Sequence, residues 1–415
     1  MDELLQLDEF WEDTRLALLS KYRVTQEQAT EINLLCSYIG KADILERVKN
    51  RTFEWGIPRK VYLNKAGTSK KRIVYMFEKE QRVLLGVLYR ALSYHFRGEI
   101  SSNCFSYKKG ISTIKAVNHL LDLNNNCDMY GVKLDIHAYF NSVSSDRLQE
   151  MIGTVFSGYE DTDIYWLIST LYSINKVVDN GVVVDEYMSL IPGTAVASFF
   201  ANYCLKDLDQ HFADFNLPYA RYSDDIILFA RTPEEIESSL SYIKDILSKY
   251  GLEVNPRKYE YFNPKDKIDF LGLTFDENEI DIHKYSFEKV KAKIRKDVAR
   301  ARKRIEQGKS FESEARKVIH RFNYRMYKCY IEDRSKFGWG YYAFRYVTTD
   351  KTLREIDFYF RDKLRYLKTG KYNKANINKT PDSELHALGY VSTVMMYNLF
   401  KIDFDAYCDR VSLLV

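Results

Sequence analysis

Apolar positions recur every three or four residues along several stretches of the chain, and this spacing predicts amphipathic helices. The longest stretch covers residues 284–305, where one apolar stripe is flanked by basic side chains. Residues 1–50 and the tail from about residue 336 also have a helical pattern, and an Asn/Lys-rich loop is expected at 371–380. The stripe of the longest stretch consists of Phe287, Val290, Ile294, Val298, Ala301 and Ile305.

Short apolar runs in the middle of the chain predict buried strands instead. These runs lie at 130–136, 219–222 and 226–230. A Pro-Gly pair at 192–193 breaks the chain before a helical pattern over 194–212. We therefore expect a strand, a helix and then two strands joined by a tight turn.

Two further pairs of short runs predict hairpins. The first pair, 60–63 and 72–77, encloses a basic and flexible tip at 64–68. The second pair, 259–263 and 268–275, encloses a polar turn that contains Pro264. Each pair is expected to close on itself, because only a few residues separate its two runs.

The composition is typical of a folded protein. The 415 residues are 46% hydrophobic and 15% aromatic, with only 7 Pro and 18 Gly, which excludes disordered, collagen-like and linker-dominated chains. This length predicts two or three structural units. No apolar run approaches the roughly 18 residues of a membrane span, so we expect a soluble, cytoplasmic protein without a membrane partner. The 6 cysteines are scattered and predict reduced thiols.

Charge is nearly balanced overall but concentrated locally. Lys and Arg number 62 against 58 Asp and Glu, a formal net charge of +4. Residues 284–304 alone hold ten basic and two acidic side chains, a local charge of +8. Such a run is either a solvated helix face or a surface for the phosphates of a nucleic acid.

Three carboxylates stand beside the predicted buried strands. Asp135 lies near the end of the first strand, and Asp224 and Asp225 lie between the last two. Carboxylates in such apolar surroundings are costly unless they are paired or bound to cations. If the strands are neighbours, the carboxylates form a site for Mg²⁺, which prefers oxygen ligands. The alternative is that the Asp pair only makes a hairpin turn.

Five segments occur in order over roughly residues 55–275. They are KLDIHAYF (133–140), PGT with AN (192–194, 201–202), YSDD (222–225), GLEVNPRK (251–258) and FLG (270–272). These segments resemble motifs A to E of reverse transcriptases. The resemblance implies an α+β right-hand polymerase fold with a helical C-terminal extension. The implied regions are an N-terminal helical region (1–50), fingers (51–130), palm with finger insertions (131–280), thumb (281–335) and extension (336–415).

The resemblance also implies residue roles in RNA-directed DNA synthesis. Two Mg²⁺ ions, which Mn²⁺ can replace, would be held by Asp135, Ile136, Asp224 and Asp225. Lys258 would protonate the pyrophosphate. Contacts to the dNTP would come from Arg72, Lys108, Gly193 and Phe140, whose ring would exclude a 2′-hydroxyl. Nucleic acid would be bound by Phe270, Leu271, Gly272, Arg295, Arg302 and Arg304.

Two departures from the family pattern qualify these roles. Pro192 stands where motif B usually has glutamine, and Lys108 stands where the fingers usually have arginine. Lysine keeps the charge of arginine but loses its bidentate phosphate geometry.

Segments beyond the thumb, including 337–342 and 388–390, are similar to the extension of bacterial defence-associated (abortive-infection and "unknown group") enzymes. This resemblance implies anti-phage defence, with a structured non-coding RNA, dNTPs and nascent cDNA as partners. A homo-oligomer is left open, and Tyr390, Tyr397 and Tyr407 are candidate protein primers. The alternatives are a retron-type or other bacterial reverse transcriptase without a defence role, a non-catalytic RNA-binding palm scaffold, and an RNA-dependent RNA polymerase, against which Phe140 argues.

Overall fold

The computed structural model describes residues 1–415 except 21–23, 65–70, 112, 124–127, 329–337 and 415. The chain divides into two compact units, Met1–Lys265 and Asp266–Val415. Both units combine helices with sheets whose strands pair mainly antiparallel, so the fold is of the predicted α+β class. Among the described residues, no helix has the length and apolar character needed to cross a membrane. The finer division into fingers, palm and thumb stays a prediction.

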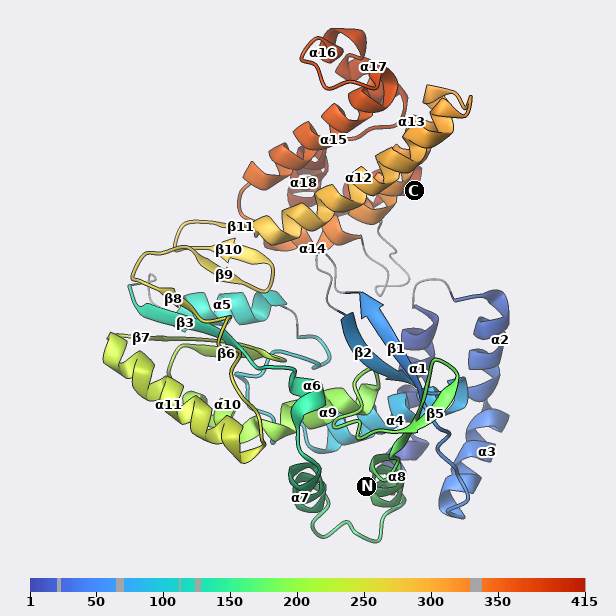
Figure 1. Cartoon of the computed structure of the whole chain (residues 1–415), viewed down its shortest axis with the longest axis vertical. Coiled ribbons are helices and arrows are strands. Elements are labelled where there is room, and N and C mark those ends of the chain that lie inside the picture. The colour runs from blue at the N-terminus through green and yellow to red at the C-terminus, as the bar shows by residue number, and fades with distance from the viewer. Residues whose placement is uncertain (21–23, 65–70, 112, 124–127, 329–337, 415) are drawn as a thin grey trace. The chain divides into compact units, whose positions relative to one another are not determined.

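The first unit begins with helices, as the pattern over residues 1–50 predicts (Figure 1). The central helix is α4 (Lys79–His95), which starts at a capping box formed by Glu78 and Gln81 and buries one apolar face against α1. Gly86 permits this contact, because a Cβ there would lie 2.5 Å from the Thr14 methyl. The N-terminal elements are η1 (Asp2–Gln6), α1 (Asp8–Leu19), α2 (Gln26–Leu35) and α3 (Tyr38–Lys49).

The predicted hairpin near the N-terminus is present and belongs to a four-stranded sheet of order β2-β1-β4-β5. Its two strands pair from Arg59 opposite Met76 to Asn64 opposite Lys71. Most of the predicted tip, from residue 65 onward, lies outside the described residues. The strands are β1 (Arg59–Asn64), β2 (Lys71–Met76), β4 (Lys176–Asp179) and β5 (Val182–Asp185).

A second sheet, of order β6-β7-β3-β8, contains the three predicted buried strands. The central strands β3 and β7 pair antiparallel along their whole length, and helices α10 and α11 pack against the sheet (Figure 1). The strands are β3 (Tyr130–Asp135), β6 (Tyr219–Tyr222), β7 (Asp225–Ala230) and β8 (Glu260–Phe262). The remaining helices of this unit are α5 (Thr113–Leu123), α6 (Tyr139–Ser142), α7 (Ser145–Val155), α8 (Asp163–Tyr172), α9 (Ala195–Cys204), α10 (Lys206–Asp214) and α11 (Pro233–Lys249).

Two predictions about these elements are wrong. The helical pattern over 194–212 forms two helices, because the chain leaves helical geometry at Leu205, with φ −113° and ψ 19°. The expected hairpin between 259–263 and 268–275 does not form. Instead β8 pairs with β3, while the second run folds back on itself at Leu271 and Gly272, whose positive φ angles make a tight turn.

The second unit combines helices that pack mainly on one another with a three-stranded sheet of order β11-β10-β9. The predicted basic helix is α12 (Lys284–Glu306); its apolar stripe is buried from Phe287 to Ala301, and Ile305 is half-buried. The expected loop at 371–380 includes a short helix, α16. The elements are β9 (Ile268–Phe270), β10 (Leu273–Phe275), β11 (Ile280–Ile282), α13 (Phe311–Tyr327), α14 (Trp339–Tyr346), α15 (Lys351–Thr369), α16 (Asn376–Lys379), α17 (Asp382–Ala387), α18 (Thr393–Ile402) and α19 (Phe404–Leu414).

Candidate active site

The sheet places the predicted carboxylates at one end of β3 and β7. Asp135 is the last residue of β3 and lies directly opposite Asp225, the first residue of β7. Asp224 precedes it in a two-residue turn, where Ser223 has φ +62° and the Ile136 amide donates to the Asp224 carbonyl at 2.9 Å. The Asp pair therefore does make a hairpin turn, and that turn meets the end of the neighbouring strand.

Burial and mutual repulsion disfavour ionisation of two of these carboxyl groups. Burial first, and then the charge of Asp135, raise the pKa of Asp224. Burial, followed by the charges of Asp224 and Asp135, raises the pKa of Asp225 to about 6. This is the electrostatic signature of acidic groups held together in a place where a positive charge would be stabilised.

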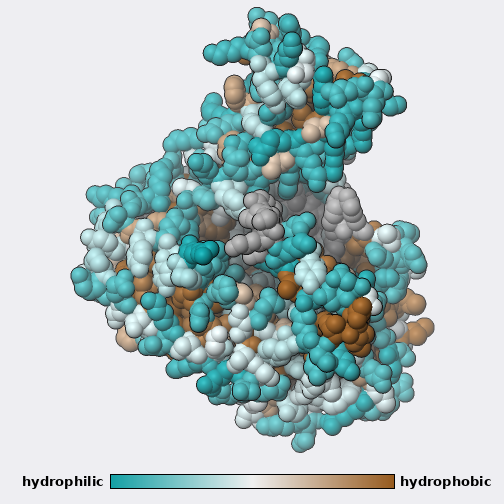
Figure 2. Space-filling model, viewed as in Figure 1, coloured by the Kyte–Doolittle hydropathy of each residue, from teal (hydrophilic) through white to brown (hydrophobic). Residues whose placement is uncertain are grey.

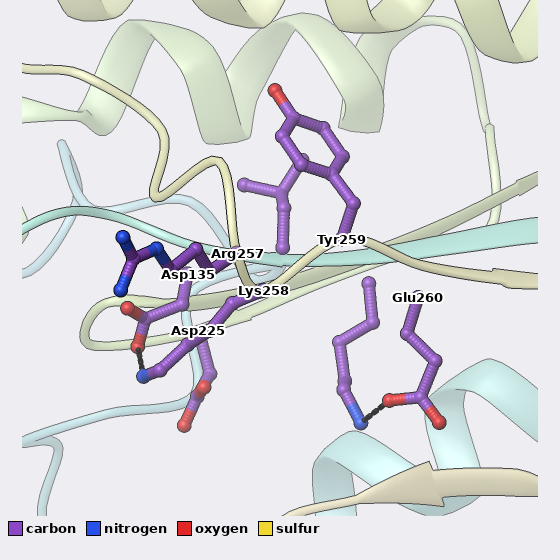
Figure 3. A pocket seen from close by; sticks show the side chains of 8 residues that line it. Asp135, Asp225, Arg257, Lys258, Tyr259 and Glu260 are labelled. Carbon is purple, nitrogen blue, oxygen red and sulfur yellow. Dashed lines mark hydrogen bonds and ion pairs between the residues drawn. The ribbon is translucent and has the colours of Figure 1, made fainter.

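Lys258 supplies a positive charge at this place. Its Nζ donates to Asp135 Oδ2 at 2.5 Å, although about half of the lysine side chain is exposed. Figure 3 shows Lys258, Asp135 and Asp225 at one end of a pocket of about 390 Å³, with Glu260 at the other end. The sequence predicted a role for Lys258 at the pyrophosphate, and the structure places its ammonium on a carboxylate of the site.

The segment that carries Lys258 is fixed to β3 by its backbone. The Asn255 amide donates to the Asp135 carbonyl at 2.8 Å, and the His137 amide donates to the Glu253 carbonyl at 2.8 Å. The Asn255 side chain also donates to Asp135 Oδ1 at 3.4 Å. These bonds hold the position of Lys258 relative to Asp135.

The donor set suits a hard divalent cation, although the side chains are not arranged as a finished metal site. Carboxylate oxygens are the ligands that Mg²⁺ and Mn²⁺ prefer. Within the described part of the chain, no three His, Cys, Asp or Glu side chains converge as a metal cluster. The raised pKa values of Asp224 and Asp225 nevertheless show that added positive charge would stabilise their ionised forms.

A group of aromatic and polar side chains lies beside the Asp224 turn. The rings of Phe140 and Tyr107 meet edge to face with centroids 6.2 Å apart, and the Tyr107 hydroxyl lies 3.1 Å from Ser223 Oγ. Burial raises the pKa of Tyr107. The charge of Asp224 raises this pKa further and the charge of Arg72 lowers it, so both groups lie close enough to interact electrostatically with the Tyr107 hydroxyl. Sequence reasoning named Phe140 and Arg72 but missed Tyr107.

Lys108 is not part of this group. Its Nζ donates to the carbonyls of Ser101 at 2.6 Å and Ile100 at 3.3 Å, and burial lowers its pKa. The Lys108 ammonium is therefore engaged with these two carbonyls and not with Ser223 or Asp224. Its neighbour Tyr107 has a positive φ of 53°, which turns adjacent side chains to different places.

Gly193 makes its close approach to a strand rather than to open space. It has φ +104°, and a Cβ there would lie 2.9 Å from Val74 Cβ and 3.0 Å from the Tyr75 carbonyl. The Tyr75 amide donates to the Pro192 carbonyl at 2.7 Å, so the Pro-Gly segment docks on β2. Glycine is therefore required at position 193 by the contact with β2, independently of any contact with a template.

A fully buried arginine, Arg221, binds the backbone of the Asp224 turn. The sequence analysis did not identify this residue. Arg221 binds Asp209 through Nε at 2.8 Å and Nη2 at 2.6 Å, and its Nη1 donates to the Ser223 carbonyl at 3.2 Å. It also donates to the Asn202 carbonyl at 3.3 Å. Burial alone would lower the pKa of Arg221, but the charge of Asp209 holds this pKa above its usual range. The available signal was an arginine inside a buried strand, which requires an acidic partner.

The predicted nucleic-acid contacts in the second unit are partly used within the protein. Phe270 is buried, while Leu271 and Gly272 form the turn between β9 and β10. Arg302 binds Glu306 at 3.1 Å and the Leu367 carbonyl at 3.3 Å, and Arg304 binds the buried Glu314 at 3.3 Å. Arg295 is exposed, with a 3.4 Å contact to the Tyr359 hydroxyl.

Comparison with known proteins identifies the family. The profile of the reverse transcriptase (RNA-dependent DNA polymerase) family matches residues 63–275, about half of the chain. The chain therefore belongs to this family, which confirms the predicted polymerase fold class and enzymatic activity and implies an RNA template.

Individual relatives are more distant. The chain is 24% identical over 242 residues to the retron Ec86 reverse transcriptase of Escherichia coli, covering 56% of this chain and 67% of that enzyme. An apo telomerase from Candida tropicalis, truncated at its C-terminal domain, aligns with 15% identity and a TM-score of 0.42 over 60% of each chain. A telomerase from Candida albicans, in complex with a fragment of telomeric RNA, aligns with 13% identity and a TM-score of 0.45 over 91% of this chain and 70% of that one.

Proposed function

We propose that Asp135, Asp224 and Asp225, with the backbone of Ile136, hold the divalent cations with which this enzyme copies RNA into DNA. The observation that carries the proposal is the strand register, which sets Asp135 opposite Asp225 beside the Asp224 turn. When bound, Mg²⁺ or Mn²⁺ would act as a Lewis acid on the primer hydroxyl and on the phosphates of the incoming nucleotide. The test is primer extension on an RNA template with wild-type protein and carboxylate variants.

Lys258 is assigned two successive contacts in this proposal. In the structure its ammonium neutralises Asp135 at 2.5 Å. Cations at the carboxylates would repel this ammonium, and its half-exposed side chain is free to turn toward the anionic pyrophosphate. There the lysine would donate a proton to the leaving group.

The group formed by Arg72, Tyr107 and Phe140 is assigned to the nucleotide. The exposed guanidinium of Arg72 offers forked donors to a triphosphate. The Phe140 ring is held edge-on by Tyr107, whose hydroxyl in turn contacts the Asp224 turn. A ring fixed in this way selects deoxyribose by occupying the space of a 2′-hydroxyl.

Phe140→Ala is expected to admit ribonucleotides. Removing the ring opens the space that it fills, so incorporation of rNTPs relative to dNTPs should rise by about tenfold or more, or at least ~1.4 kcal/mol. The measurement is single-nucleotide extension with each substrate, and Phe140→Tyr is the matched control that keeps a ring. Unchanged selectivity in Phe140→Ala would remove this residue from the proposal, and a wild-type preference for rNTPs would favour an RNA-dependent RNA polymerase.

Asp225→Asn is expected to alter how stability depends on pH. The pKa of Asp225 is raised to about 6. Its contribution to the free energy of unfolding is therefore fully present below the pKa of the unfolded chain and is lost as pH rises through about 6. Without divalent cations, Asp225→Asn should gain stability relative to wild type across this window, and Mg²⁺ should raise the melting temperature of wild type more than that of the variant. Thermal denaturation at stepped pH, with and without Mg²⁺, measures both. Identical pH profiles would contradict the assignment.

The biological role is proposed to be anti-phage defence with a structured non-coding RNA as template. The proposal is supported by the resemblance of the C-terminal segments, of which 338–342 and 388–390 are described here, to defence-associated enzymes. Sequencing of RNA and cDNA that co-purify with the protein tests the partner, and phage plating on cells that carry wild type or Asp224→Asn tests the role. Bound RNA without cDNA would favour the scaffold alternative, and cDNA without protection would favour an enzyme with no defence role.

The structure argues against the three suggested tyrosines as protein primers. Tyr390, Tyr397 and Tyr407 are all buried. The hydroxyl of Tyr397 donates to the Val347 carbonyl at 3.1 Å, and that of Tyr407 donates to the Tyr327 carbonyl at 3.0 Å. A primer hydroxyl has to reach the active site, so these residues would first have to leave the core.

A further inference from the structure

The end of α15 and the segment after it form a basic and aromatic surface that the proposed catalytic roles leave unused. Over residues 363–379 the sequence contains six basic residues and no acidic one. The segment includes the last turns of α15, a loop and the short helix α16, all within the second unit. Figure 2 shows mostly hydrophilic residues around α16 and α17. We call this surface the basic tip; it consists of Lys363, Tyr366, Lys368, Lys371, Tyr372, Lys374 and Lys379.

Two tyrosines of the basic tip are already stacked. The rings of Tyr366 and Tyr372 lie 4.3 Å apart at an angle of 7°. Lys363 Nζ binds the Tyr372 hydroxyl at 2.6 Å and lies 4.1 Å from the ring centroid. Tyr372 is nevertheless 58% exposed, so more than half of its surface is accessible to a planar ligand. An exposed aromatic surface beside a cation is the arrangement on which unpaired bases stack.

The loop that carries Tyr372 is held in place from inside. The buried Asn376 side chain donates to the Lys371 carbonyl at 2.6 Å, and the Thr369 hydroxyl donates to the same carbonyl at 3.1 Å. The buried Arg365 donates to the Thr380 carbonyl at 3.1 Å. Because these bonds fix the backbone, a ligand would not have to bear the full cost of ordering the loop.

Apart from Lys363, which contacts Tyr372, the lysines of the basic tip fall into two groups. Lys368 is engaged with Glu384 at 2.7 Å, so it stabilises the fold. Lys371, Lys374 and Lys379 are exposed, and their ammonium groups make no hydrogen bond or ion pair with any residue that the structure describes. Exposed cations in the same segment as an aromatic stack can contact phosphates while bases stack, which is how proteins bind single strands.

The basic tip adjoins the basic helix of the same unit. Gly370 ends α15 with φ +71°, and a Cβ there would lie 2.8 Å from Arg302 Nη2. Arg302 also donates to the Leu367 carbonyl at 3.3 Å. Arg302 of α12 therefore contacts the end of α15 directly before the loop that carries Tyr372.

We propose that the basic tip binds an unpaired segment of the RNA that carries the template, at a position outside the copied region. This inference rests on the proposed function for the identity of the RNA. RNA is favoured because its loops and bulges present unstacked bases to aromatic side chains. Lys371, Lys374 and Lys379 would neutralise phosphates of this segment, and a base would stack on the ring of Tyr372.

The first test is binding of the full-length protein to an unstructured RNA of about 12 nucleotides, followed by fluorescence anisotropy. Tyr372→Ala should weaken binding about tenfold, while Tyr372→Phe, which keeps the ring, should stay near wild type. Lys371→Gln combined with Lys374→Gln should reduce the slope of log affinity against log salt by about 1.4, the value for two phosphate contacts to a single strand. Tyr342→Ala is the matched control, because Tyr342 is 46% exposed in the same unit.

The second test separates this site from the active site. Ultraviolet crosslinking of the same RNA should label the peptide that contains Tyr372, in wild type and equally in Asp224→Asn. Tyr372→Ala should still extend a short pre-annealed primer at the wild-type rate. If the wild-type protein extends no primer but the Tyr372 peptide is still crosslinked, the proposed function is wrong and the binding site stands. Equal binding by wild type, Tyr372→Ala and the lysine pair, or crosslinks only elsewhere, would overturn the inference.

Discussion

Asp224→Asn is expected to abolish cDNA synthesis while leaving the protein folded and able to bind RNA. Asparagine has nearly the same shape as aspartate but cannot supply the negative charge that a divalent cation requires. Metal assistance contributes several kcal/mol to such a reaction, so the rate should fall by about a thousandfold or more. Primer extension on an RNA template measures this loss.

The matched control for this experiment is Asp245→Asn, which changes an exposed carboxylate on α11 of the same unit. It should retain wild-type synthesis. The melting temperature of Asp224→Asn without divalent cations should not fall, because the variant removes a buried carboxyl whose pKa is raised by its surroundings. Synthesis at more than a tenth of the wild-type rate would remove Asp224 from the metal assignment.

Arg221→Met is expected to cause the largest loss of stability among the variants considered. The ion pair between Arg221 and Asp209 is fully buried, and removing one partner leaves the other charge without compensation. Breaking such a pair costs about 3–5 kcal/mol. Chemical denaturation measures the free energy of unfolding, and a loss below about 1 kcal/mol would contradict the interpretation.

The double variant Arg221→Met with Asp209→Asn separates charge from position. Asparagine keeps an acceptor for the Tyr219 hydroxyl, which lies 2.9 Å from Asp209 Oδ1, but removes the uncompensated charge. Stability should therefore recover in large part. Synthesis should stay low, because the bond from Arg221 to the Ser223 carbonyl beneath the Asp224 turn is still missing. Full recovery of both stability and synthesis would show that Arg221 does not position the turn.

The elements that sequence analysis predicted well are those whose pattern is local. Strands β3 and β7 and helix α12 each have an apolar run or stripe that is sufficient to specify them. The sequence predicts that Asp135 meets the Asp pair if their strands are neighbours, and in the structure these strands pair. The roles of these aspartates as metal ligands stay a prediction.

The errors concern which segments pair and where a regular pattern is interrupted. β8 and β9 follow each other closely, but β8 pairs with β3, which is far away in the sequence. The turn at Leu271 was not foreseen, because leucine rarely adopts a positive φ. Apolar spacing continues through Leu205, so the pattern did not reveal the break between α9 and α10.

The sheet order also has a consequence for the synthesis of the protein on the ribosome. Strand β3 pairs with β7 and β8, which follow it by roughly a hundred residues or more. At translation rates of about 5–20 residues per second, β3 waits several seconds or longer for its neighbours. During this time an apolar strand with unpaired edges is open to aggregation, so early intermediates are expected to need chaperones. A nascent chain that stops before Glu260 would lack the last strand of the sheet that carries the three carboxylates.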